Sequence, residues 1–210
     1  MNAAGTTLTY ATYLAGTTNA TDEANGVAVD SSKNVYVTGY TTSTTFPTTT
    51  GVYQTKSPNS GEAGFVAKIN PAAPGAASLV YSTYLGGGSY SALENGIAVD
   101  GSGNAYVAGN AGPDFPSTTG AFSYDGEGFG EGGVYVTKLN PTATALGYSA
   151  YLGVGTATGI TVDTTGDAYL KERRPSKISR LLQAHTRLTI RMRLPAKSML
   201  RAVHRSIPLS

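Results

Sequence analysis

The chain has 210 residues and a formal net charge of +2, with 27 glycines, 14 tyrosines, no cysteine and no tryptophan. The lack of cysteine excludes disulfides, thiolate metal sites and cysteine nucleophiles, and no stretch approaches the roughly 20 apolar residues that span a bilayer. The charge is unevenly divided: residues 1–170 carry four Lys against twelve Asp and Glu (net −8), and residues 171–210 carry eleven Lys and Arg against one Glu (net +10). This break in composition predicts a boundary near residue 170.

The chain opens with a segment that is typical of a β-strand. Residues 1–5 have neither the basic nor the apolar region of a signal peptide, so no signal peptide is expected in this chain. Residues 8–14 alternate in the period-two manner of a strand, and closely similar segments recur at residues 79–85 and 146–152. We place this strand first in each repeating unit, so the chain is expected to begin inside a repeat.

A second motif predicts a strand, a tight turn and another strand. It covers residues 26–39, recurs at residues 96–109, and recurs in part at residues 159–169. β-prone Val, Ile and Tyr flank a turn that is rich in Asp, Asn, Ser and Gly, which is the residue chemistry of a hairpin. A Phe-Pro segment follows at residues 46–47 and 115–116.

The final strand of each unit is predicted at residues 64–71 and 133–141, and the spacing from Gly26 to Gly96 equals that from Lys68 to Lys138. A long fixed period indicates a propeller or a solenoid. Four short strands per unit favour four-stranded antiparallel blades, because solenoid coils are usually shorter. We therefore predict an all-β, incomplete β-propeller within residues 1–170. Its first blade is residues 8–71, its second is 79–141, and 146–169 form part of a third.

These four segments, taken in order, resemble the bacterial SBBP repeat, the "seven-bladed β-propeller" repeat, over residues 2–169. The resemblance implies a large secreted or cell-surface bacterial protein in which the blades are structural or adhesive. It brings no catalytic motif. The sequence departs from the repeat pattern in having too few blades for a ring and in breaking off after Tyr169 in the third unit.

Residues 171–210 form a basic tail that has three interpretations. It is a nucleic-acid-binding or anionic-membrane-binding arm, a basic amphipathic helix over residues 178–200, or the product of a frameshift. A shifted reading of the codons from Ile178 permits a Phe-Pro-Thr-Thr segment like residues 46–49, at the expected distance from Asp163. A second match to residues 68–73 is permitted at residues 196–202. We therefore predict a non-homologous, frameshift-derived tail, disordered or loosely helical.

Two groups of acidic residues are candidate sites. Asp30, Asp100 and Asp163 begin the repeated turns, and each is followed four residues later by Asn34, Asn104 or Asp167. Their oxygens could bind calcium, but Asp and Asn also cap turns through backbone hydrogen bonds, which is the interpretation we favour. An acidic glycine-rich loop contains weak calcium candidates whose spacing does not fit an EF-hand: Asp125, Glu127 and Glu131.

Tyrosines form the other candidate surface. Four are predicted to be exposed and able to line a carbohydrate-binding or protein-binding surface: Tyr40, Tyr53, Tyr90 and Tyr124. Six recur in the predicted strands and are expected to pack between blades: Tyr10, Tyr13, Tyr36, Tyr81, Tyr84 and Tyr106. The two histidines, His185 and His204, lie in the tail, which excludes Ser-His-Asp catalysis and histidine metal sites in residues 1–170.

The sequence thus predicts a non-enzymatic structural or adhesive repeat segment with no cofactor other than possible calcium. Its expected partners are protein or carbohydrate ligands, and self-association through open blade edges is also expected. The expected location is extracellular or on the cell surface. Two alternatives stay open, namely the remnant of a propeller-scaffold enzyme of the lyase or glycosidase type, and a nucleic-acid or anionic-membrane binder that uses the tail.

Overall fold

The computed structural model describes residues 2–17, 19–58, 61–88, 91–121, 133–173, 188–192 and 201–203, the last two ranges as backbone only. Within them the regular secondary structure is almost entirely β-strand, with a single 3₁₀ turn at Gly75–Ser78. The strands form three antiparallel four-stranded sheets, each made from strands that are consecutive in the chain. The all-β fold with four-stranded antiparallel units is therefore confirmed.

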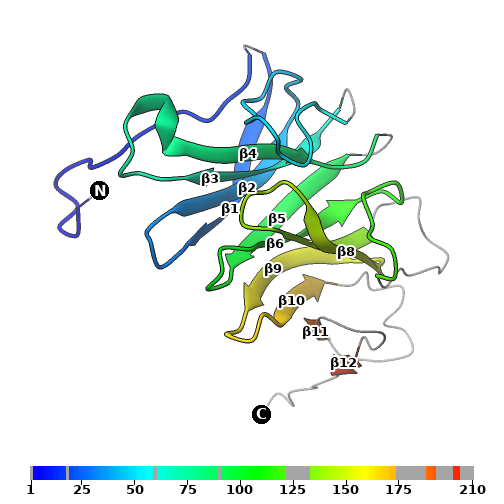
Figure 1. Cartoon of the computed structure of the whole chain (residues 1–210). Helices are drawn as coiled ribbons and strands as arrows, with labels where there is room; N and C mark the ends of the chain where they lie inside the picture. The colour runs from blue at the N-terminus through cyan, green and yellow to red at the C-terminus, as the bar shows by residue number, and fades with distance from the viewer. Residues whose placement is uncertain are drawn as a thin grey trace.

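The first sheet has the strand order β1-β2-β3-β4, and Figure 1 shows it in blue and green at the top of the molecule. Its strands are β1 (Asp22–Val29), β2 (Val35–Thr41), β3 (Ala63–Ile69) and β4 (Leu79–Leu85). Tyr36 lies opposite Lys68, and Phe65 lies opposite Tyr84. Since side chains alternate between faces along a strand, this register puts Tyr36 on one face of the sheet and Phe65 on the other.

The second sheet repeats the first one along the chain, with the order β5-β6-β7-β8. Its strands are β5 (Ala92–Val99), β6 (Ala105–Ala111), β7 (Gly133–Leu139) and β8 (Leu146–Gly153). The repetition extends to irregularities, because β1 and β5 each carry a bulge two residues into the strand, between Ala24 and Gly26 and between Glu94 and Gly96. The repeat in the sequence is thus a repeat of backbone geometry.

The third sheet comprises β9 (Thr156–Val162), β10 (Ala168–Arg173), β11 (Leu188–Met192) and β12 (Arg201–Val203). The last two strands lie in the basic tail, where the sequence analysis expected a disordered or loosely helical segment. That expectation is wrong for these two short strands. The free edge of β10 offers unpaired N–H and C=O groups, and the alternating Leu188–Met192 segment pairs with it. The frameshift origin of the tail stays a prediction.

The strand at the start of each predicted unit belongs to the preceding sheet instead. Leu79–Leu85 pairs with β3 of the first sheet, and Leu146–Gly153 pairs with β7 of the second. The matching residues 8–14 form no strand, because β3, the third strand of the sheet that follows them, is already paired with β4. Tyr13, which was expected to pack between blades, is 97% exposed for the same reason, and that prediction is wrong.

The three sheets stack face to face along the chain, as Figure 1 shows. Their first strands lie side by side: β5 lies against β1, and β9 lies against β5. The recurring glycine of the strand–turn–strand motif allows this approach. An ideal Cβ at Gly26 would lie 3.2 Å from Gly96 Cα, and one at Gly96 would lie 3.2 Å from Gly159 Cα. The glycine therefore sets the spacing of the innermost strands.

Two apolar clusters fill the space between the sheets. The first joins the Tyr36 face of the first sheet to Ile97 and Val107 of the second. The second joins the Tyr106 face of the second sheet to Ala168 and Leu170 of the third. The second sheet thus buries both of its faces, which a four-stranded sheet cannot do alone.

Candidate functional site

The repeated aspartate turns are the polar sites that the sequence singled out, and the structure shows how they are held. In the first turn, Asp30 Oδ1 accepts a hydrogen bond from the Asn34 amide (2.9 Å), and Oδ2 accepts one from Asn34 Nδ2 (2.8 Å). The Tyr36 hydroxyl donates to Oδ2 at 3.2 Å, and Lys68 Nζ lies 3.5 Å from the same oxygen. The carboxylate is therefore fully engaged within its own sheet.

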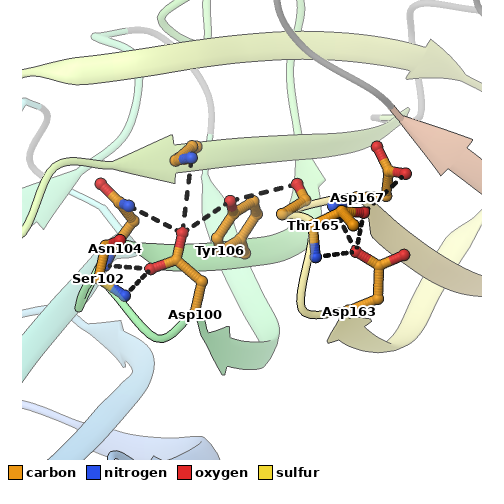
Figure 2. A network of polar contacts seen from close by, with 9 residues as sticks. Asp100, Ser102, Asn104, Tyr106, Asp163, Thr165 and Asp167 are labelled. Carbon is orange, nitrogen blue, oxygen red and sulfur yellow. Dashed lines mark hydrogen bonds and ion pairs between the residues drawn. The ribbon is translucent and has the colours of Figure 1, made fainter.

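The second turn repeats this arrangement (Figure 2). Asn104 donates to Asp100 through its amide at 2.9 Å and through Nδ2 at 2.8 Å, and the Tyr106 hydroxyl donates at 3.0 Å. Lys138 Nζ lies 3.6 Å from Asp100 Oδ2 and 4.8 Å from the centre of the Tyr106 ring. The Tyr106 hydroxyl also lies 3.3 Å from the Gly166 carbonyl, which links this turn to the turn of the third sheet.

The third turn replaces the asparagine with Asp167. Asp163 Oδ1 accepts hydrogen bonds from the Asp167 amide (2.9 Å) and from the Thr165 hydroxyl (2.7 Å). The Tyr169 hydroxyl donates to Asp163 Oδ2 at 3.0 Å. Arg191 of β11 lies opposite Tyr169, the register position that Lys68 and Lys138 hold opposite Tyr36 and Tyr106.

Hydrogen bonding governs the acidity of these carboxyl groups. Partial burial raises the pKa of Asp100, but the hydrogen bonds from Asn104 and Tyr106 outweigh it, so that the pKa lies below the ordinary 3.8. Hydrogen bonds from the Thr165 hydroxyl and the Asp167 amide lower the pKa of Asp163 to about 2. Both groups are carboxylates at neutral pH, and their protein partners occupy the oxygens that a cation would need. The turn-capping interpretation is supported.

Sequence reasoning found the Asp and Asn of each turn and missed the Tyr and Lys that complete it. A signal was present, because Tyr36, Tyr106 and Tyr169 each follow the aspartate at the same short spacing. Lys68 and Lys138 are equally regular, but they lie much further along the chain, and only strand pairing brings them to the aspartate.

The calcium candidates Asp125, Glu127 and Glu131 lie outside the described residues. Within the described ranges, no three His, Cys, Asp or Glu side chains gather into a group that could hold a metal ion.

The tyrosines divide differently from the prediction. Tyr36, Tyr81, Tyr84 and Tyr106 are buried, as expected. Tyr10 is partly buried and donates to Ser78 Oγ at 2.9 Å. Tyr53, expected on the surface, is partly buried and packs against the first apolar cluster. Tyr40 is partly exposed and donates to Glu23 at 3.0 Å, while Tyr90 and Tyr124 lie outside the described residues.

The long connections between the second and third strands, residues 42–62 and 112–132, are the other candidate site. Both leave their sheets at the same end, opposite the short aspartate turns. In the first connection, the Phe46 amide donates to the Tyr84 hydroxyl at 2.9 Å, and that hydroxyl donates to the Ser43 carbonyl at 2.7 Å. The Gln54 amide donates to Thr83 Oγ1 at 2.9 Å. β4 thus holds the described part of this loop in place.

A cavity of about 40 Å³ lies beside the second connection. Phe115, Pro116, Tyr135 and Tyr151 are among the residues that line it. It has room for a few water molecules, and it is far smaller than typical small-molecule sites.

Among the described residues, no helix is long and apolar enough to cross a membrane.

Consecutive four-stranded antiparallel sheets, stacked around closely spaced first strands, define this chain as an incomplete β-propeller. The SBBP family model, described as a beta-propeller repeat, matches residues 9–47 and 80–116. Two segments of the chain thus match the model of this beta-propeller repeat, one in each of the first two repeating units. Both matches begin in the tyrosine-rich segment and end at the Phe-Pro motif, so they cover the same part of each repeat. A search of curated proteins found no match.

Proposed function

We propose that this chain is a non-catalytic structural and adhesive repeat segment of a bacterial secreted or cell-surface protein. Its long strand connections would bind a protein or glycan ligand. The observation that carries the proposal is the pair of connections at residues 42–62 and 112–132, which leave two adjacent sheets at the same end. Connections of this length are uncommon in compact domains unless they are functional or disordered, and binding residues concentrate on loops that a rigid scaffold positions.

The hydrogen bonds that fix the first connection support this role. Backbone groups of the loop are bonded to β4 from Phe46 to Gln54, while Thr44 and Thr50 are exposed. A loop held in its bound conformation loses little conformational entropy when a ligand binds. The aspartate turns at the other end contribute differently, because their polar groups are engaged with one another.

The test is binding of the purified chain to arrays of glycans and of extracellular host and bacterial proteins. The double variant Thr44→Glu/Thr50→Glu changes the loop end, and Ser31→Glu/Ser32→Glu places the same charge on exposed residues of the short-turn end. We expect the loop variant to lose at least tenfold in affinity for a captured ligand and the turn variant to retain it.

Three results would contradict the proposal. Equal loss in both variants would show that the loop end is not the binding surface. Turnover of a polysaccharide would favour the alternative of a lyase-type or glycosidase-type enzyme. Binding to nucleic acid or anionic vesicles that falls steeply with salt would favour the basic tail as the binding element.

Calcium binding by Asp125, Glu127 and Glu131 stays a separate prediction, which calorimetry with calcium would test.

A further inference from the structure

Glu94 is a fully buried carboxyl group at the junction between the first and second sheets. It lies on β5 with none of its surface exposed. Its side chain reaches across the junction to β3 of the first sheet, where a Cβ on Gly64 would collide with both carboxyl oxygens. Neither oxygen has a hydrogen-bond partner among the described residues. An ionised carboxylate in such a place carries a large desolvation cost.

Tyr135 is the titratable neighbour of Glu94. It lies on β7, fully buried, with its ring stacked on Phe115 at 3.8 Å between centroids. Its hydroxyl passes over Gly109, where an ideal Cβ would lie 2.7 Å from the hydroxyl oxygen. The two groups are close enough for Tyr135 to lower the pKa of Glu94, but they do not meet in a hydrogen bond. Burial outweighs this effect and raises the pKa of Glu94 well above 4.5.

The other repeats show that this position does not require a carboxyl group. Ala24 and Ala157 occupy the position of Glu94 in the first and third sheets, and Phe65 occupies the position of Tyr135 in the first. At the junction between the second and third sheets, Val134 stands where Gly64 stands, and it joins Ala157 in one apolar cluster. At this pair of equivalent positions the chain therefore has Val and Ala in one junction and Gly and Glu in the other.

We propose that Glu94 is a proton-binding site that makes the junction between the first and second sheets sensitive to pH. The protonated, neutral carboxyl group fills the space over Gly64 and holds the two sheets together. Ionisation places a negative charge there with no cation beside it among the described residues. The cations of the facing strands, Lys68 of β3 and Lys138 of β7, are engaged with Asp30 and Asp100. The other titratable groups on the strands packed against β5 are acidic or phenolic, and β9 has none: Asp22 and Glu23 of β1, Tyr36 and Tyr40 of β2, Tyr106 of β6 and Tyr135 of β7. The junction therefore loosens as the proton is lost.

The direction of the pH effect follows from linkage. The unfolded chain releases the Glu94 proton near its ordinary pKa of 4.5, whereas the folded chain holds it to higher pH. The contribution to stability is complete below about 4.5 and is lost as the pH rises toward the folded pKa. Across this window the unfolding equilibrium constant should rise about tenfold per pH unit, relative to a chain that lacks the group.

The experiment compares urea unfolding of the full chain from pH 4 to pH 9 with that of three variants. Glu94→Gln keeps the shape and removes the proton. Gly64→Val/Glu94→Ala copies the Val134 and Ala157 pair of the second junction into the first junction. Glu23→Gln removes an exposed glutamate of β1 as the matched control. We expect both Glu94 variants to lose the tenfold change per pH unit and the control to keep it.

A second measurement tests the proposal even if a variant fails to fold. Infrared spectroscopy of the unmodified chain should show a carboxylic acid band that persists at a pH where the exposed carboxyl groups are ionised. Amide exchange should localise the loosening at high pH to β3 and β5, with β7 and β8 less affected. Identical pH profiles for the unmodified chain and Glu94→Gln would overturn the proposal, and so would a carboxylic acid band that disappears together with those of the exposed carboxyl groups.

Discussion

At the scale of single residues, the third position after the turn aspartate differs between repeats. Gly103 and Gly166 hold it in the second and third turns with φ of 81° and 84°, but Lys33 holds it in the first with φ of 66°. A residue with a Cβ is strained in this left-handed region, whereas glycine adopts it without steric cost. The first turn therefore retains a strain that the other two avoid.

Lys33→Gly should consequently stabilise the chain. The relief of left-handed strain exceeds the entropic cost of glycine, which leaves a gain of about 0.5–1 kcal/mol in the free energy of unfolding. Gly103→Ala should produce a loss of about 1 kcal/mol at the matching position. Urea denaturation at neutral pH would measure both changes. A destabilising Lys33→Gly substitution would show that the lysine side chain contributes more than its backbone strain costs.

The aspartate carboxylates should also determine how the chain unfolds in acid. The folded pKa of Asp100 lies below 3.8, so its contribution is present above that pH and is lost as the pH falls through the folded pKa. Asp100→Asn should therefore flatten the acid limb of the stability curve below about pH 4, as measured by urea unfolding between pH 2 and pH 5. An unchanged limb would contradict the prediction. The Glu94 effect lies above pH 4.5 and has the opposite sign, which separates the two groups.

At the scale of elements, equivalent strands have different environments because of their place in the stack. β1 and β5 have the same bulge and the same pairing pattern. Val27 of β1 is nevertheless 67% exposed, whereas Ile97, its equivalent on β5, is 7% exposed beneath the first sheet. The two exposures differ because the first sheet covers β5, whereas no described sheet covers this face of β1.

Truncation of these two residues should measure that difference. Ile97→Ala should cost about 2–4 kcal/mol, because it leaves a cavity in the first apolar cluster. Val27→Ala should cost less than about 0.5 kcal/mol, as is usual for exposed positions. Thermal or urea unfolding of the dilute protein would compare the two. Equal costs would show that a further sheet or a second molecule covers β1 in solution.

At the scale of the whole molecule, the two end sheets present different outward faces. The first sheet exposes Val27 and Val29, whose counterparts in the second sheet pack against a neighbouring sheet. The third sheet exposes Lys171 at the position where Thr38 and Ala108 are fully buried between sheets. A lysine there opposes the stacking of another sheet because its charge would have to be buried. The first face is therefore the one that favours association.

We expect the chain to self-associate in a concentration-dependent manner through this face. Val27→Lys/Val29→Lys should reduce the association measured by analytical ultracentrifugation, and Val80→Lys, a change on the exposed side of edge strand β4, serves as the control. If only the control variant lost association, the contact would lie at the open strand edges instead. A monomer with one sharp unfolding transition at all concentrations would contradict association through the face and through the edges.

The sequence by itself determined the local features of this protein. Period-two alternation and the Asp, Asn and Gly of the turns place the paired strands around residues 30–34 and 100–104, because those signals act within a few residues. The long fixed spacing of the motifs predicted repeated four-stranded sheets, since each repeat carries the same local signals. The Asp and Asn of the candidate turns were also visible as turn-capping residues.

Only the tertiary structure decided which strands join the same sheet and which side chains meet between sheets. The segment at residues 79–85 has the same pattern whether it begins one sheet or ends another, since alternation specifies faces and says nothing of the pairing partner. Lys68 reaches Asp30 through pairing of β2 with β3. Glu94 is buried because Gly64, on a strand of the neighbouring sheet, leaves space for it. These are contacts between distant residues, and the pairing and stacking of the strands create them.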